Sequence, residues 1–96
     1  MNLGKTISDL RKKKNLKQFE LAEKCNITQA YLSHIENNNK EPHISTLREI
    51  SKALDIPLPI IFFLSMDEED VSPDKKELSS FLIKNFKLIL ENNYIE

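Results

Sequence analysis

The sequence predicts an all-α fold, a compact domain of five helices followed by a C-terminal sixth helix. Leu, Lys, Glu and Ile dominate the composition, whereas valine occurs once and tryptophan is absent, so helix formers outnumber strand formers. One glycine and four prolines are too few for the many tight turns of a small β-sandwich or barrel. With 96 residues, of which 40% are hydrophobic and 30% charged, the chain has the size and balance of one globular domain.

Three helices are predicted within the first forty residues, because apolar residues recur there at helical spacing. Each is followed by asparagine, which adopts the left-handed backbone conformation at modest cost. These asparagines are Asn15, Asn26 and the run Asn37-Asn38-Asn39. Thr28 has the side chain of an N-cap residue for the third helix. The expected ranges are 3–14, 18–25 and 29–37.

Two further helices are predicted before residue 65. The fourth begins at His43 or Ser45 and runs to Leu54, with apolar residues at helical spacing. The fifth covers residues 58–64, because Pro57 suits the first turn of a helix. Together with the first three, these helices form a domain that we expect to span residues 1–65.

The rest of the chain is predicted to be an acidic linker, residues 66–73, and a C-terminal segment, residues 74–96. That segment contains a helix over about 73–92, which Ser72-Pro73-Asp74 would cap. Its apolar stripe is too wide to face solvent alone, so it either folds back on the monomer core or pairs with a second protein surface. The stripe consists of Leu78, Phe81, Leu82, Phe86, Ile89 and Leu90.

Composition also excludes several classes of protein. A lone cysteine, Cys25, cannot form a disulfide framework and is expected to be a small buried hydrophobe. His34 and His43 are too few to form a metal site, so we expect neither metal nor cofactor. With no serine–histidine–aspartate arrangement and no glycine-rich phosphate loop, no enzymatic activity is expected.

No membrane or secretory segment is predicted either. The longest apolar run, residues 56–64, contains two prolines and is far shorter than the roughly 20 residues that cross a bilayer. The N-terminus lacks the apolar region of a secretory signal. The expected location is therefore the cytoplasm.

Charge is distributed unevenly along the chain. Residues 1–40 carry eight basic and four acidic side chains, a net charge of +4, and residues 41–96 carry six basic and eleven acidic ones, a net charge of −5. The first half is therefore the part suited to a polyanion, which the second half would repel.

Residues 17–36, KQFELAEKCNITQAYLSHIE, predict two short helices that cross at a steep angle. The small Ala22 permits the close crossing, and Ile27 fills the corner between the helices. The outward face of the second of these helices then carries short polar and amide side chains, which match the size and chemistry of a DNA major groove. These residues are Gln29, Ala30, Ser33, His34 and Asn37.

With these residues the chain resembles the lambda-repressor-like helix-turn-helix family, also called Cro-type or Xre-type. The resemblance covers about residues 3–64. Asn26 and Asn38 stand where the family commonly has glycine, a departure that leaves the fold intact because asparagine reaches the left-handed conformation. The matching residues are Leu10-Arg11, Gln18, Leu21-Ala22, Ile27-Thr28, Leu32-Ser33, Ile35-Glu36, Pro42, Leu47, Ile50 and Leu54.

The resemblance implies a role for individual residues. Gln29, Ala30 and His34 match positions that face base edges, and Ser33 and Asn37 lie within reach of bases or backbone. Arg11 and Glu36 match a pair that often forms a partly buried ion pair. Contacts to phosphates are implied for Gln18, Thr28, Tyr31, Asn39 and Lys40.

We therefore expect a sequence-specific DNA-binding transcriptional regulator, a repressor, that binds a palindromic operator. It would bind as a homodimer, and the C-terminal helix would join the two copies. The alternative is an antitoxin-type or other regulatory module whose C-terminal helix binds a partner protein. The size of the purified protein in solution distinguishes these two hypotheses. A stable homodimer favours self-pairing through the C-terminal helix, whereas a monomer favours a missing partner protein.

Overall fold

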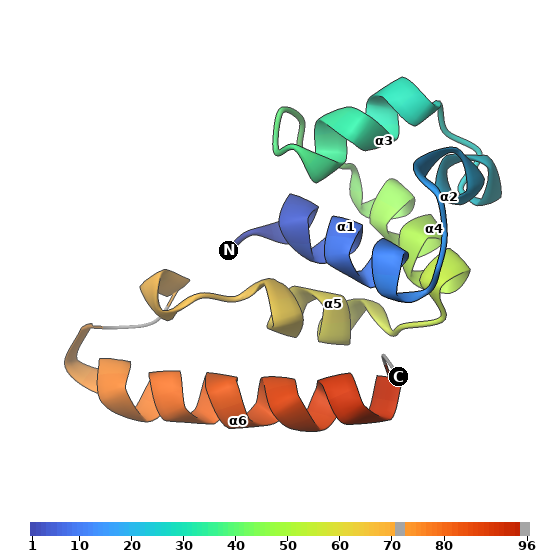
Figure 1. The fold of residues 1–96 in the computed structure, drawn as a ribbon. Helices are drawn as coiled ribbons and strands as arrows, with labels where there is room; N and C mark the ends of the chain where they lie inside the picture. Colours follow the sequence, from blue (N-terminus) through green and yellow to red (C-terminus); the bar gives the residue numbers. More distant parts are fainter. Residues whose placement is uncertain (71–72, 95–96) are drawn as a thin grey trace.

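Helices make up most of the structure. The computed structural model describes residues 1–70 and 73–94, and it contains no β-strand in that part of the chain, so the all-α prediction is confirmed. Helices α1 to α5 form a bundle, and α6 lies beneath α5 (Figure 1). The elements are α1 Leu3–Lys13, α2 Gln18–Lys24, α3 Gln29–Glu36, α4 Ile44–Leu54, α5 Leu58–Ser65, the short 3₁₀ helices η1 Glu68–Asp70 and η2 Pro73–Lys75, and α6 Lys76–Tyr94.

The core lies between α1 and α5 and draws on every helix of the bundle. Its side chains come from the apolar positions that helical spacing predicts, and burying each one stabilises the fold by about 1.5–3 kcal/mol. Ile44, which stands at helical spacing with Leu47 and Ile50, is the exception, because this first residue of α4 is 52% exposed. The most deeply buried apolar side chains are Ile7, Leu21, Leu32, Ile35, Ile50, Leu54, Ile56 and Ile61.

Helix ends follow the predicted chemistry closely. Asn15, Asn26 and Asn38 have φ values of 59°, 55° and 59°, so the predicted left-handed asparagines are confirmed. Thr28 Oγ1 accepts the Tyr31 N–H at 3.0 Å, which is the predicted N-cap bond. Asp55 also adopts φ 55° at the end of α4, a feature not predicted.

The predicted helix ranges differ from the observed ones by one to three residues. The second and third helices end at Lys24 and Glu36, and Cys25 and Asn37 form their C-caps. The sixth begins at Lys76, after a 3₁₀ turn over Pro73–Lys75, and continues to Tyr94. Residues 71–72, including the predicted cap Ser72, and residues 95–96 lie outside the described part of the chain.

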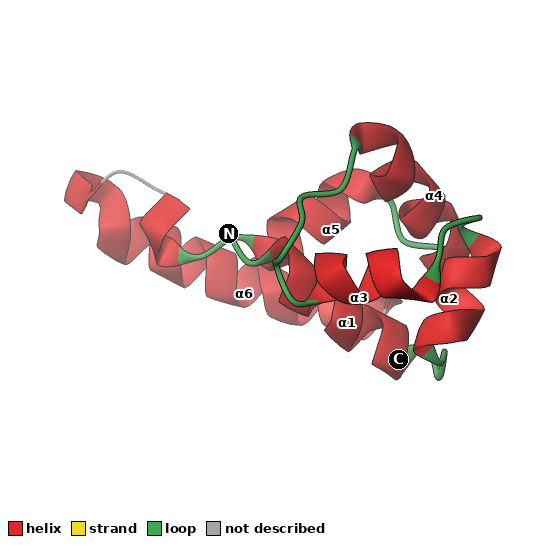
Figure 2. Cartoon of the chain, turned by 90° about the horizontal axis from the view of Figure 1, so that it is seen from above, coloured by secondary structure: helices red, strands yellow, loops and turns green. Residues whose placement is uncertain are grey.

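Helix α6 packs mainly on α5. The rings of Phe63 and Phe86 meet edge to face with centroids 5.9 Å apart, and Lys87 Nζ donates to the Met66 carbonyl at 2.8 Å. Leu90 packs against the core. Seen from above, the N-terminal part of α6 extends beyond the bundle (Figure 2).

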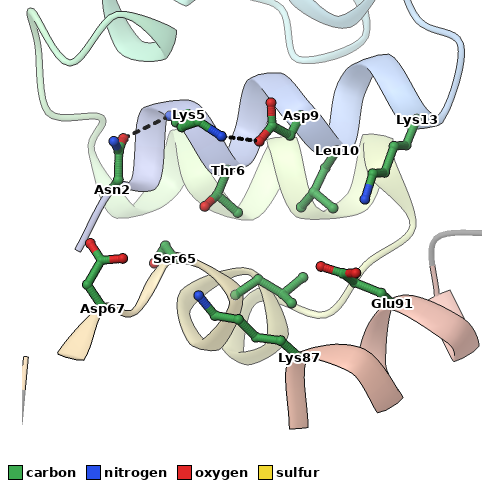
Figure 3. A pocket seen from close by; sticks show the side chains of 11 residues that line it. Asn2, Lys5, Thr6, Asp9, Leu10, Lys13, Ser65, Asp67, Lys87 and Glu91 are labelled. Carbon is green, nitrogen blue, oxygen red and sulfur yellow. Dashed lines mark hydrogen bonds and ion pairs between the residues drawn. The ribbon is translucent and has the colours of Figure 1, made fainter. Parts of the chain in front are cut away.

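A cleft of about 390 Å³ separates α6 from α1 (Figure 3). Lys5 and Asp9 of α1 form an ion pair at 2.9 Å on one side of it, and Lys87 and Glu91 of α6 lie on the other. Helix α6 is therefore anchored through α5 and leaves this surface of α1 open. None of the helices in the described ranges is both long and apolar enough to cross a membrane.

Candidate DNA-binding surface

Helices α2 and α3 form the predicted helix–turn–helix. Ala22 is only 2% exposed where α2 meets α3, and the Ile27 N–H donates to the Ala22 carbonyl at 3.0 Å, which closes the turn through the left-handed Asn26. Helix α3 lies on the opposite side of the bundle from α6 (Figure 1). Helix α3 belongs to the net-positive first 40 residues, whereas α6 belongs to the net-negative remainder.

One face of α3 is buried and the other is accessible. Leu32 and Ile35 are 0% and 1% exposed and anchor the helix in the core. Tyr31 is half-buried and packs against that core. The predicted base-facing residues lie on the opposite side: Gln29, Ala30, His34 and Asn37 are exposed, and Ser33 is half-buried.

A chain of polar side chains connects α1 to the first residue of α3. Arg11 donates to Glu36 twice, from Nε to Oε2 at 2.8 Å and from Nη2 to Oε1 at 3.0 Å. Gln18 Nε2 donates to Glu36 Oε1 at 3.2 Å, and Gln29 Nε2 donates to Gln18 Oε1 at 3.4 Å. The ion pair therefore holds Gln18, and Gln18 in turn orients Gln29.

The predicted ion pair between Arg11 and Glu36 is present and largely buried. The side chains of Arg11 and Glu36 are only 10% and 5% exposed, and Arg11 Nη1 also donates to the Leu16 carbonyl at 2.8 Å. Each of the three guanidinium nitrogens of Arg11 thus donates to a group of the protein itself.

The predicted phosphate contacts surround the accessible face of α3. Thr28, Asn39 and Lys40 are exposed, and Gln18 is half-buried at the start of α2. The backbone N–H groups of Asn39 and Lys40 both donate to the His34 carbonyl, at 2.8 and 3.3 Å, so the loop after α3 is tied to the last turn of the helix.

Asn37 is less free than the other base-facing candidates. Its Nδ2 donates to the Ser33 carbonyl at 2.9 Å and lies 3.4 Å from Ser33 Oγ. A base contact through this amide nitrogen would need that bond to be exchanged, whereas the carbonyl oxygen of the side chain is available.

Cys25, His34 and His43 do not come together. Cys25 is buried, and burial, together with the charge of Glu49, raises the pKa of its thiol from 9.0 to about 11. His43 is the N-cap residue of α4, which is one of the two predicted starts of that helix. The described residues contain no group of three or more histidine, cysteine, aspartate or glutamate side chains arranged to hold a metal ion.

The role of Gly4, the single glycine, was missed from the sequence, where it served only to argue against small β-folds and phosphate loops. Gly4 is buried, and a Cβ atom there would collide with the Ile35 carbonyl oxygen and approach the Glu36 carbonyl oxygen to 2.9 Å. The signal that could have revealed this close approach is a lone glycine inside a predicted helix, where glycine costs about 1 kcal/mol of stability relative to alanine.

The comparisons with known proteins agree with this geometry. The helix-turn-helix family model matches residues 7–61. The chain is 31% identical to the immunity repressor protein of Bacillus phage phi105, covering 88% of this chain and 67% of that protein. It is 33% identical to the HTH-type transcriptional regulator SinR of Bacillus licheniformis, covering 81% of this chain and 68% of that protein.

Two solved structures share the fold over nearly the whole chain. The clp gene regulator ClgR from Corynebacterium glutamicum has a TM-score of 0.66 at 21% identity and covers 99% of this chain and 93% of its own. The complex of the SinR and SinI proteins has a TM-score of 0.62 at 28% identity and covers 95% of this chain and 93% of its own.

Proposed function

The chain belongs to the lambda-repressor-like helix-turn-helix family, and we propose that it is a sequence-specific DNA-binding transcriptional repressor whose recognition helix is α3. The observation that carries the proposal is the two-sided character of α3. Its apolar face is anchored in the core, and the side chains of Gln29, His34 and Asn37 on its other face are exposed. A B-DNA major groove admits a helix presented in this way.

In this proposal each accessible side chain has a chemical role. Gln29 donates to and accepts from the major-groove edge of an adenine, while Ala30 contacts a thymine methyl group. Ser33, His34 and Asn37 contact further base edges or the backbone. Phosphates are bound by Gln18, Thr28, Tyr31, Asn39 and Lys40, which fix the register of the helix on the duplex but carry no sequence information. Occupation of promoter DNA then represses transcription, in the cytoplasm.

The proposal also includes a homodimer formed through α6. One helix-turn-helix unit makes few base contacts, and two units on a palindromic site double them. The outward side of α6, opposite the side that packs on α5, carries large apolar side chains with substantial exposure. These are Leu78, Phe81, Leu82, Leu88 and Ile89, and Phe86 lies at the edge of this side, 49% exposed although its ring also meets Phe63 of α5.

A second copy of the chain fits this outward side because the apolar residues are not interrupted by charge. At 3.6 residues per turn, the lysines and glutamates of α6 all lie on the remaining part of its circumference. Two identical copies can therefore approach without like-charge repulsion. Leu90, which the sequence placed in the same stripe, packs against the core instead and supports the fold-back role that was left open.

The alternative function, a module that binds a partner protein through α6, has one observation in its favour. The structurally similar SinR was solved in complex with a different protein, SinI. The same outward apolar side of α6 would bind that partner. A purified chain that is monomeric until a second protein is added would favour this alternative over self-pairing.

The DNA-binding proposal is tested by selecting bound sites from random duplexes and then measuring affinity by fluorescence anisotropy. Gln29→Ala should lower discrimination at one or two base pairs by about 1–3 kcal/mol each. Lys40→Ala should weaken cognate and random DNA similarly and lower the salt slope by about 1. Equal losses on cognate and random DNA for Gln29→Ala would contradict direct recognition of bases.

The homodimer is tested by sedimentation of purified protein. Leu82→Glu places a charge on the outward side of α6 and should give a monomer with lower operator affinity. Lys84→Glu, an exposed charge change elsewhere on α6, is the matched control and should remain dimeric. A dimer that survives Leu82→Glu would place the interface on another surface.

A further inference from the structure

We propose that Asn38 is a positioning residue for DNA binding, because its side chain joins the end of the recognition helix to the beginning of α1 and so fixes the loop that carries Asn39 and Lys40. The proposal rests on the proposed function of α3. In this role Asn38 does not itself touch DNA but positions the residues that do.

The joint consists of hydrogen bonds between two helix ends that are far apart in sequence. The Gly4 N–H donates to Asn38 Oδ1 at 3.1 Å, and Asn38 Nδ2 donates to Asn2 Oδ1 at 2.8 Å. Asn2 Oδ1 also accepts the Lys5 N–H at 3.1 Å and so caps α1. Asn38 thus satisfies one of the N-terminal N–H groups that a helix cannot satisfy by itself.

Close packing keeps the two ends together. Gly4 lies against the last turn of α3 so tightly that a Cβ atom would clash with the Ile35 carbonyl oxygen and stand 2.5 Å from Asn38 Oδ1. The only glycine in the chain therefore stands where the backbones of α1 and α3 meet. Any larger residue at this position has to push the end of α3 outward.

The backbone of Asn38 does not by itself require asparagine. With φ at 59°, the position would accept glycine at lower conformational cost. Asparagine instead supplies a side chain that reaches α1 with both its oxygen and its nitrogen. The residue type is explained by the joint rather than by the turn.

The consequence for DNA binding comes from the two residues that follow. Asn39 and Lys40 are tied to the His34 carbonyl on one side and, through Asn38, to α1 on the other. Lys40 is exposed in this loop. These contacts to α3 and to α1 at the beginning of the loop restrict the positions that the lysine can take, which lowers the ordering cost when it binds a phosphate.

The test is a double-mutant cycle between Asn38→Gly and Lys40→Ala, measured as affinity for the selected operator. Asn38→Gly keeps the left-handed backbone and removes the side chain, and we expect it to weaken binding about threefold to tenfold. Lys40→Ala should weaken binding several-fold in the parent protein and by a clearly smaller factor in the Asn38→Gly background. An unchanged factor would overturn the proposal, because a merely structural role does not alter the contribution of Lys40.

A second measurement examines the joint without DNA. Labelling with ¹⁵N-glycine and ¹³C-carbonyl leucine identifies the Gly4 amide, because Gly4 follows Leu3 whereas a glycine at position 38 follows Asn37. Hydrogen exchange at Gly4 should be slow in the parent protein and in Asn38→Asp, whose carboxylate still accepts the bond, and at least tenfold faster in Asn38→Gly. Equal exchange in all three proteins would show that the joint does not form.

Asn26→Gly is the matched control, because Asn26 is also a left-handed asparagine but makes no side-chain hydrogen bond among the described residues. Asn26→Gly should change neither the hydrogen-exchange rate of the Gly4 amide nor the factor by which Lys40→Ala weakens operator binding. If the parent protein selects no DNA sequence, the proposed function fails, and the Gly4 exchange still decides whether the joint exists. A change in the control equal to that of Asn38→Gly would overturn the proposal.

Discussion

Replacing Glu36 with leucine should remove a large part of the stability of the fold. The Glu36 carboxylate is 5% exposed and accepts three hydrogen bonds, two from Arg11 and one from Gln18. Without it, the Arg11 guanidinium, 10% exposed, keeps only the Leu16 carbonyl as a partner. An uncompensated buried charge of this kind costs about 3–5 kcal/mol. A domain of this size has a total stability of only about 5–14 kcal/mol.

The double variant Arg11→Met/Glu36→Leu provides the decisive comparison. Replacing both partners of a buried ion pair by apolar groups is often close to neutral, so most of the lost stability should return. Operator affinity should nevertheless stay low, because Gln18 has lost the acceptor that holds it in place for Gln29. The single and double variants thus separate folding from recognition.

The assay is urea unfolding followed by circular dichroism at one fixed protein concentration, with the slope of the free energy against urea checked for constancy. DNA affinity is measured on the same samples below the unfolding transition. A cost below about 1 kcal/mol for Glu36→Leu would refute the reasoning from burial. So would a double variant as unstable as the single one.

Three further predictions concern stability. Ile50→Ala removes a side chain with 0% exposure and should cost about 2–5 kcal/mol in urea unfolding, whereas Ile44→Ala at the exposed start of α4 should cost far less. Thr28→Ala loses the N-cap bond to Tyr31 N–H and should cost about 0.5–2 kcal/mol, seen as a lower Tm; no change would mean that water replaces the cap fully. Because burial raises the pKa of the Cys25 thiol from 9.0 to about 11, the unfolded state loses its thiol proton first, so stability should fall as the pH rises above about 9. Cys25→Ala should make this fall of stability with pH less steep.

The features that the sequence predicted correctly depend on neighbours along the chain. Helical spacing placed Ile7, Leu32 and Ile50 in the core, and the left-handed tendency of asparagine placed the turns at Asn15 and Asn26. The helix ends shifted by one to three residues, because capping bonds and 3₁₀ turns extend or shorten the first or last turn of a helix. The accessible face of α3 followed from the same spacing.

Features that the sequence did not reveal involve contacts between distant segments. Gly4 and Asn38 are separated by 34 residues, and the side chains of Asn38 and Asn2 by 36. Helix α6 also distributes its apolar residues between two sides, with Leu90 against the core and Leu88 outward. An apolar stripe in the sequence does not show which of its side chains pack against the core and which stay exposed.

The sequence by itself determined the helices, the turns between them and the polar outward face of the recognition helix, because spacing, capping and backbone preference act within about one or two turns. The family resemblance also implied the Arg11–Glu36 ion pair, but only the tertiary structure decided that Gln18 and Gln29 extend this pair into one hydrogen-bonded chain. It also decided that the end of α3 rests on the start of α1. These arrangements arise when the helices pack. The distances between distant side chains are fixed by the shape of the whole core and not by any local pattern.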